Sequence, residues 1–260
     1  MGKDTDSAGD RKPIIEIDGV SFAYNGQTVL QDVNLTVYER EFVWIVGPNG
    51  GGKTTLMKIM LGLLAPARGS VKLLGVAPLE ARSRIGYLPQ HVDTDRQFPI
   101  SVLEVALMGR LRRGMRWGPF PAEDTRVALD ALQQVGLAEL AERPAGELSG
   151  GQHRRLLIGR ALAAQPELLL LDEPMANLDR QVEKELHELL QQLNKHLTIV
   201  MVSHDPAFVS DFVKQVVCVN RTVAVHPTSV MENEFVGELY GSGMRVVRHD
   251  QHDHHHSEDL

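Results

Sequence analysis

The feature that most constrains this chain is a glycine-rich segment that follows a buried strand and opens a helix. Residues 42–46 are continuously apolar, as in a strand covered on both faces, and residues 53–64 have helical composition. The segment 47–54, GPNGGGKT, fits the pattern G-x-x-x-x-G-K-[ST]. Motif and context together predict a phosphate-binding loop.

This loop has a defined chemistry. Glycines let successive backbone N–H groups converge on phosphate oxygens, and the helix N-terminus adds partial positive charge. Lys53 is expected to reach the β- and γ-phosphates and Thr54 to ligate Mg²⁺. The alternative is a plain glycine-rich turn before a helix. The residues expected to contact nucleotide are Gly47, Pro48, Asn49, Gly50, Gly51, Gly52, Lys53, Thr54 and Thr55.

A second apolar run, residues 168–171, ends in Asp172 and Glu173. Two carboxylates there are costly unless they emerge at the C-terminal edge of a sheet beside a ligand. Asp172 is then expected to hold the magnesium, and Glu173 to orient or activate the attacking water. Alternatively the pair caps a following helix, a reading that Pro174 and Asp179 support.

Strands and helices alternate in the second half of the chain. A third apolar strand is predicted at 198–202, after a helix at 180–194 whose apolar residues recur at helical spacing. This order predicts a parallel sheet covered on both faces. Short alternating runs between residues 14 and 37 predict antiparallel strands, and residues 99–165 read as a mostly helical insertion.

The pentapeptide LSGGQ, residues 148–152, precedes a helical stretch and by itself could be a capped loop. It is identical to the signature loop of the ATP-binding cassette family, and it lies upstream of the acidic strand as in that family. The resemblance covers roughly residues 14–226. It implies an α/β P-loop NTPase core with an N-terminal antiparallel β subdomain and an inserted α-helical subdomain.

The resemblance also implies an ATPase that uses ATP and Mg²⁺. Tyr24 matches the aromatic residue that stacks on adenine, with Phe22 as its rival. Gln90 matches the glutamine that touches magnesium and water, and His204 the switch histidine near the γ-phosphate. Asp179 matches the aspartate loop. The catalytic set implied is Glu173, His204, Gln90 and Lys53.

In this family two cassettes sandwich ATP head to tail, so one copy implies a homodimer or a paired cassette. The partner would bring Ser149, Gly150, Gly151 and Gln152 to the phosphates, where they would exclude water and stabilise developing charge. Departures are mild: Gly51 stands where many members have Ala or Ser, and His153 follows the signature glutamine.

Composition disfavours nucleic acid as a partner. The chain has 260 residues with 27 Lys and Arg against 34 Asp and Glu, a formal charge of −7. The basic stretch beside Trp117 predicts a plain solvated face, with contact to nucleic acid as the alternative. It is formed by Arg110, Arg112, Arg113 and Arg116. The single cysteine, Cys218, lies in an apolar run and is expected to be a core residue.

No apolar run is long enough to span a bilayer, so the expected location is cytoplasmic, peripheral on the inner face of the membrane. The resemblance implies integral membrane permease subunits as partners and, indirectly, a periplasmic or extracellular substrate-binding protein. Residues 98–110 are the expected docking surface for the permease, and their sequence resembles that of the zinc and manganese importer subfamily. The alternatives are an iron-chelate or cobalamin importer, or a non-transport ATPase acting on nucleic-acid or protein complexes.

The expected organisation is a disordered lead-in at 1–12, an ATPase domain at 13–240 with its helical part at about 99–165, and a flexible tail at 241–260. The tail holds five of the eleven histidines, mixed with acids. It suits zinc or another transition metal, although a solubilising tail or a purification remnant is the alternative. The histidines are His249, His252, His254, His255 and His256.

Overall fold

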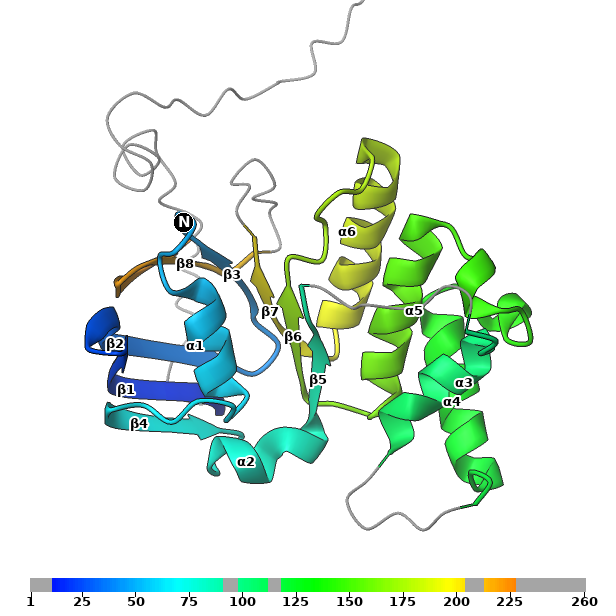
Figure 1. Cartoon of the computed structure of the whole chain (residues 1–260), viewed down its shortest axis with the longest axis horizontal. Coiled ribbons are helices and arrows are strands. Elements are labelled where there is room, and N and C mark those ends of the chain that lie inside the picture. The colour runs from blue at the N-terminus through cyan, green and yellow to red at the C-terminus, as the bar shows by residue number, and fades with distance from the viewer. Residues whose placement is uncertain (1–10, 91–97, 112–117, 204–212, 228–260) are drawn as a thin grey trace, which may run out of the picture.

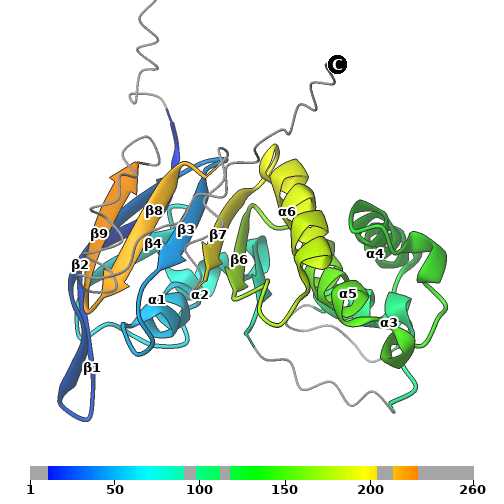
Figure 2. The same ribbon diagram turned by 90° about the horizontal axis from the view of Figure 1, so that it is seen from above.

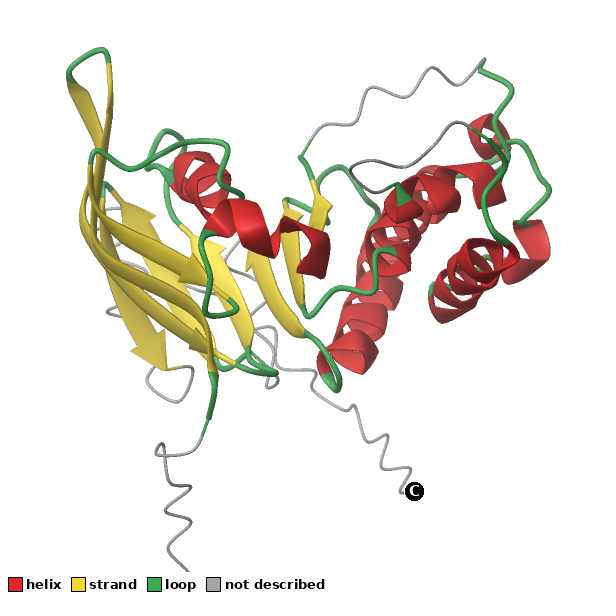
Figure 3. Cartoon of the chain, turned by 90° about the horizontal axis from the view of Figure 1, so that it is seen from below, coloured by secondary structure: helices red, strands yellow, loops and turns green. Residues whose placement is uncertain are grey.

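The fold rests on two β-sheets and a separate group of helices (Figure 1). The structure is a computed structural model, and it describes residues 11–90, 98–111, 118–203 and 213–227. In Figures 2 and 3 the strands gather on one side of the molecule and the helices α3, α4 and α5 on the other. The first sheet has the strand order β2-β1-β4, and the second has the order β5-β6-β7-β3-β8-β9.

The second sheet forms the centre of the molecule. Its first five strands in spatial order are parallel, and β9 is antiparallel to β8. Successive residues of these strands face opposite sides: Trp44 packs toward the helical side of the sheet, and Ile45 packs toward the antiparallel sheet. Their bounds are β3 Phe42–Val46, β5 Ile85–Leu88, β6 Leu168–Asp172, β7 Thr198–Val202, β8 Gln215–Asn220 and β9 Thr222–Pro227.

The antiparallel sheet confirms the strands predicted near the N-terminus. β1, Pro13–Tyr24, pairs with β2, Gln27–Tyr38, through a turn at Asn25 and Gly26, and with β4, Arg68–Leu73. Asn25 has φ 47°, a left-handed conformation that asparagine tolerates better than most residues. The buried side chains of this sheet share a core with helix α1 and one face of the central sheet.

Helices cover the other face of the central sheet. α5 packs against α3, α4 and the strand β5, and α6 lies between the sheet and this group in Figure 2. The bounds are α1 Lys53–Met60, α2 Pro78–Ala81, α3 Val102–Leu107, α4 Ala122–Gln134, α5 Gly150–Ala163 and α6 Arg180–Asn194.

Helix α1 is shorter than the sequence predicts. It ends at Met60 rather than near residue 64, because Gly62 adopts a left-handed φ of 63°. The N–H of Gly62 donates to the carbonyl of Ile59 at 2.9 Å, which closes the helix end. Residues 61–64, three of them leucines, therefore leave the predicted helix, and Leu63 is 57% exposed.

The segment 98–110 is not a continuous surface. Val102, Val105 and Leu107 of α3 are buried in the core shared by the helices. Arg110 is only 5% exposed, so the reading of it as part of a solvated or nucleic-acid-binding basic face is wrong. Its charge is satisfied inside the protein by Asp124. The other residues of that predicted face, 112, 113, 116 and 117, lie outside the described residues.

Candidate nucleotide site

The predicted site residues follow strands that end at one edge of the central sheet. The parallel register aligns β5 with β6 and β6 with β7, whose last residues Asp172 and Val202 pair. The carboxyl ends of parallel strands form a crevice where ligands bind in such folds. The phosphate loop after β3, Gln90 after β5 and Glu173 after β6 therefore share this edge.

One residue predicted to lie at this edge, His204, is outside the described residues. β7 ends at Val202, and the N–H of Ser203 donates to the carbonyl of Ile45 at 3.0 Å. His204 is the next residue and is outside the described part of the chain. Its role therefore stays a prediction.

Lys53, the first residue of α1, is held over the phosphate loop. Its Nζ donates to the carbonyl oxygens of Gly47 at 2.7 Å and Pro48 at 3.0 Å, and the residue is 7% exposed. Burial lowers the pKa of this ammonium, while the charges of Glu173 and then Asp172 oppose that shift. The lysine and both carboxylates are thus within electrostatic reach of one another.

The helix start is built to receive an anion. Gly52 is the N-cap of α1 and supplies no side-chain cap, so the N–H groups of the first turn have no acceptor within the helix. A Cβ added at Gly50 would meet nothing within 4 Å, so the loop is open on that side. Both features fit a phosphate group.

The residues predicted to hold magnesium supply oxygen donors of the right kind. Asp172 is 2% exposed at the end of β6, Gln90 is half-buried after β5, and Thr54 is exposed in the first turn of α1. Carboxylate, amide and hydroxyl oxygens are the ligands that Mg²⁺ prefers.

Tyr87 is a residue near this site that the sequence did not predict. Burial and then the charge of Asp172 raise the pKa of its hydroxyl. Tyr87 is a residue of the strand β5, and nothing in the sequence of that strand indicates that Asp172 lies near it.

Glu173 adopts an unusual backbone conformation. Its φ is 49°, in the left-handed region that is unfavourable for residues that carry a Cβ. Its N–H donates to the carbonyl of Val202 at 2.9 Å, which fixes the turn. Strain of this kind concentrates at functional sites. β6 ends at Asp172, so Glu173 lies in the turn that follows the strand rather than in the strand itself.

An aromatic pair lies at the end of β1. Tyr24 is 43% exposed, and its ring meets the half-buried Phe22 edge to face at a centroid distance of 4.8 Å and an interplanar angle of 79°. Phe22 packs against the core shared with α1. Tyr24 is therefore the ring available for stacking, and Phe22 supports it from behind.

The pentapeptide forms the N-terminus of α5 with a reciprocal cap. Ser149 Oγ accepts from the N–H of Gln152 at 3.2 Å, and Gln152 Oε1 accepts from the N–H of Ser149 at 3.0 Å. Ser149 and Gly150 are exposed. Gly151 is buried, and a Cβ there would lie 2.6 Å from Cγ1 of Val182 on α6. The loop is thus anchored on one side and open on the other.

Asp179 settles how α6 begins. Its Oδ1 accepts from the N–H of Val182 at 3.0 Å, so Asp179 is the N-cap of that helix. The alternative in which Asp172 and Glu173 cap this helix is therefore wrong. Because Val182 also packs on the pentapeptide, the aspartate loop and the pentapeptide are neighbours.

The structure does not bring the phosphate loop and the pentapeptide together within one chain. In Figures 1 and 2 the central strands lie between α1, which the phosphate loop opens, and α5, which the pentapeptide opens. Within one chain, the pentapeptide therefore does not cover the phosphate loop.

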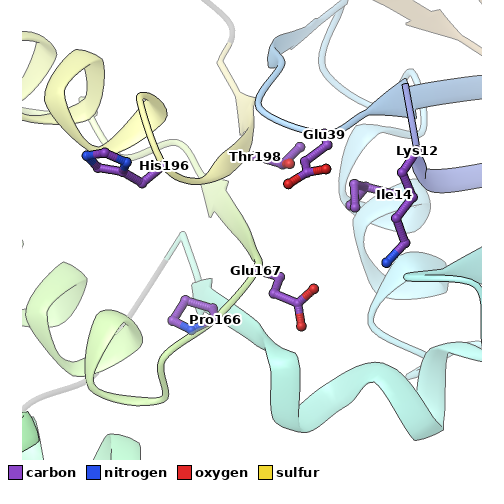
Figure 4. A pocket seen from close by; sticks show the side chains of 7 residues that line it. All are labelled: Lys12, Ile14, Glu39, Pro166, Glu167, His196 and Thr198. Atoms are coloured by element: carbon purple, nitrogen blue, oxygen red, sulfur yellow. The ribbon is translucent and has the colours of Figure 1, made fainter. Parts of the chain in front are cut away.

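A small pocket at the opposite edge of the sheet offers a different environment (Figure 4). Its volume is about 110 Å³. Among its charged residues, Glu167 is already paired with Arg84, Oε2 accepting from Nη2 at 2.7 Å. It contains none of the predicted site residues. The side chains that line it belong to Lys12, Ile14, Glu39, Pro166, Glu167, His196 and Thr198.

Among the described residues, no group of three His, Cys, Asp or Glu side chains could hold a metal ion, and the tail histidines lie outside those residues. Within the same ranges, no helix combines the length and apolarity needed to cross a membrane. Cys218 is buried, as predicted.

The edge of the sheet and its loops define a P-loop NTPase that hydrolyses ATP. Residues 30–176 match the ABC transporter family. The zinc import ATP-binding protein ZnuC of Pseudomonas entomophila is 37% identical over 251 residues, 95% of this chain and 91% of that protein. The manganese transport system ATP-binding protein MntB of Bacillus subtilis is 37% identical over 238 residues, 90% and 95% of the two chains. This chain belongs to the ABC transporter family.

A solved structure agrees in fold. An inward-facing conformation of a metal-chelate type ABC transporter aligns with a TM-score of 0.78 at 28% identity, covering 88% of this chain and 89% of that one. The predicted fold class, with its antiparallel sheet and helical part, is confirmed.

Proposed function

We propose that this chain is the ATP-hydrolysing subunit that powers a membrane importer for a divalent transition metal, zinc or manganese. The observation that carries the proposal is its 37% identity, over 95% and 90% of its length, to proteins named for zinc import and manganese transport. Transport would be driven by ATP hydrolysis at the nucleotide site, because the lysine, the carboxylates and the open helix terminus are the groups that this reaction needs.

In this proposal the phosphate loop and Lys53 bind the triphosphate. The Lys53 ammonium, already over the loop at the Gly47 and Pro48 carbonyls, donates to the β- and γ-phosphates. Asp172, Thr54 and Gln90 hold Mg²⁺, which when bound neutralises charge on the phosphate oxygens. Tyr24 stacks on the adenine ring, for which its exposure is suited.

Glu173 is the proposed general base. Its carboxylate accepts a proton from the water that attacks the γ-phosphorus as the bond to the bridging oxygen breaks. Asp172 is less suited, since it is 2% exposed at the strand end and is the proposed magnesium ligand. Gln90 positions the water, and His204 contacts the γ-phosphate.

A second cassette completes the site. Ser149 and Gly150 are exposed at the start of α5, and the central strands lie between α5 and the helix α1 that follows the phosphate loop. In a head-to-tail homodimer or paired cassette, the hydroxyl and N–H groups of residues 149–152 reach the partner's γ-phosphate and exclude water. Asp179 supports this surface through α6.

The permease is proposed to bind the exposed apolar side chains around α3. Phe98, Met108 and Leu111 are 60%, 43% and 62% exposed, whereas the intervening face of α3 is buried. An integral membrane permease at this surface holds the chain on the cytoplasmic inner face of the membrane. The permease would in turn receive cargo from a periplasmic or extracellular substrate-binding protein.

Leu111→Glu tests this surface. Placing a charge in an apolar contact costs more than about 1.4 kcal/mol, so permease binding and metal uptake should fall by about tenfold. The ATPase rate of the purified chain should stay within about twofold, because Leu111 lies outside the nucleotide edge. The matched control is Leu129→Glu on α4, 37% exposed. Equal losses of uptake in both variants would contradict the assignment.

A second cargo class has support from one comparison. The aligned solved structure is described as a metal-chelate type transporter and is 28% identical. An iron-chelate or cobalamin importer would use the same cassette, because the cassette does not touch the cargo.

The tail is proposed to bind zinc or another transition metal, on the strength of its composition alone: five histidines among acids. We also propose the domain boundaries 13–240 and 241–260. The start of β1 at Pro13 supports the start of the domain at residue 13. The helices between Val102 and Ala163 support the helical insertion at about 99–165.

A further inference from the structure

The turn between β8 and β9 lies directly behind the phosphate loop. The N–H of Arg221 donates to the carbonyl of Gly51 at 2.9 Å. On its other side, the carbonyl of Arg221 accepts from the N–H of Gln31, in β2, at 2.7 Å. The Arg221 backbone thus links the phosphate loop to the antiparallel sheet.

The same turn presses against the loop through a carbonyl. A Cβ added at Gly47 would lie 2.1 Å from the oxygen of Val219, and a Cβ at Gly51 would lie 2.6 Å from it. Contacts that short do not occur, so side chains at these positions would force the loop and the turn apart. Gly51 therefore has no room for a side chain as long as the turn keeps this position.

The turn is a single residue in an uncommon conformation. Asn220 pairs with Thr222, and Arg221 between them has φ 63°. Arginine rarely adopts this left-handed region. The two backbone hydrogen bonds of Arg221 hold it there.

The position of the Gly51 carbonyl affects the phosphate side of the loop. In a trans peptide the C=O and the next N–H point in opposite directions. Fixing the Gly51 carbonyl toward the turn therefore directs the Gly52 N–H away from the turn. Preorganised donors bind an anion more tightly than donors that must be ordered on binding.

We propose that Arg221 is a positioning residue for ATP binding: its backbone N–H orients the Gly51–Gly52 peptide of the phosphate loop. The side chain of Arg221 has no part in this. The inference rests on the proposed role of the phosphate loop in binding ATP, and it is independent of the cargo.

Arg221→Pro tests the inference, because proline removes the N–H and cannot adopt φ 63°. We expect the Kd and the KM for MgATP to rise by about tenfold, with a smaller change in kcat at saturating ATP. Arg221→Gly keeps the N–H and the left-handed conformation, and it should retain wild-type affinity. Binding is measured by titration with a fluorescent ATP analogue, and folding by thermal denaturation without nucleotide.

Arg40→Pro is the matched control. Arg40 also has a left-handed φ, 61°, and its N–H donates at 2.9 Å to Thr198 Oγ1, at the other edge of the sheet. It should lose stability like Arg221→Pro while keeping its affinity for MgATP. A similar loss of affinity in both proline variants would overturn the inference, because the effect would then be general.

Gly51→Ala decides the matter if Arg221→Pro does not fold. This change alters no residue of the turn, but its Cβ would push the loop and the Val219 carbonyl apart, so the Kd for MgATP should again rise by about tenfold. An affinity within twofold of wild type would overturn the inference. Failure of the wild-type chain itself to bind MgATP would instead refute the proposed role of the phosphate loop.

Discussion

Glu173→Gln is expected to bind MgATP and to hydrolyse it at least about 100-fold more slowly than wild type. The amide keeps the shape of the side chain but cannot accept the proton of the attacking water. The strained φ of 49° and the hydrogen bond from the Glu173 N–H to Val202 involve only the backbone, so the local fold should persist. Steady-state phosphate release gives the rate, and nucleotide titration gives the affinity.

Glu167→Gln is the control for this prediction. Glu167 precedes β6 at its other end, and it pairs with Arg84 on the surface. Its variant should hydrolyse ATP within about twofold of wild type, since exposed pairs contribute about 1 kcal/mol or less and the residue is remote from the nucleotide edge. Unimpaired hydrolysis by Glu173→Gln, with Glu167→Gln also unimpaired, would refute Glu173 as the base.

Arg110→Met should lower the free energy of unfolding by about 3–5 kcal/mol. Arg110 Nε donates to Asp124 Oδ1 at 2.8 Å, and Nη1 donates to the Ala163 carbonyl at 2.8 Å and to Gln165 Oε1 at 3.2 Å. The guanidinium thus joins the segment that follows α3, the helix α4 and the end of α5. Methionine fills the volume but leaves the buried Asp124 carboxylate without its cation.

Two further variants separate charge from packing. Arg126→Met removes an exposed cation of α4 that contacts Glu123 at 2.7 Å and Asp130 at 3.1 Å, and it should cost less than about 1 kcal/mol. The double variant Arg110→Met/Asp124→Leu removes both buried charges and should recover much of the loss. Urea unfolding followed by circular dichroism measures all three. Equal effects of Arg110→Met and Arg126→Met would contradict the account.

The nucleotide edge was predictable from sequence because its chemistry resides in side chains at fixed spacing. The loop at 47–54 and the acids at 172 and 173 follow apolar strands, and parallel pairing brings such strand ends together. The pentapeptide was predicted to precede a helical stretch, and the helix begins within it, with Ser149 as its N-cap. Its reciprocal cap with Gln152 follows from the residue types alone.

Other features depend on contacts between distant segments, which leave no local pattern. An arginine in a basic stretch is predicted to be solvated. Arg110 is instead buried, because Asp124 and the carbonyl of Ala163 in α5 accept its hydrogen bonds. Arg221 acts through its backbone, so its residue type gives no sign of its contact with Gly51. The early end of α1 follows from Gly62, whose left-handed conformation a composition-based reading overlooks.

The most direct test of the central claim is uptake of zinc, manganese and iron in cells whose only copy of this protein is wild type or Glu173→Gln. Uptake of labelled ions, and of iron offered as a chelate, is measured with equal amounts of both proteins at the membrane. The account predicts that the variant selectively loses zinc or manganese uptake. Unchanged uptake of both ions would contradict it, and a loss confined to the chelate would assign the cassette to a chelate importer.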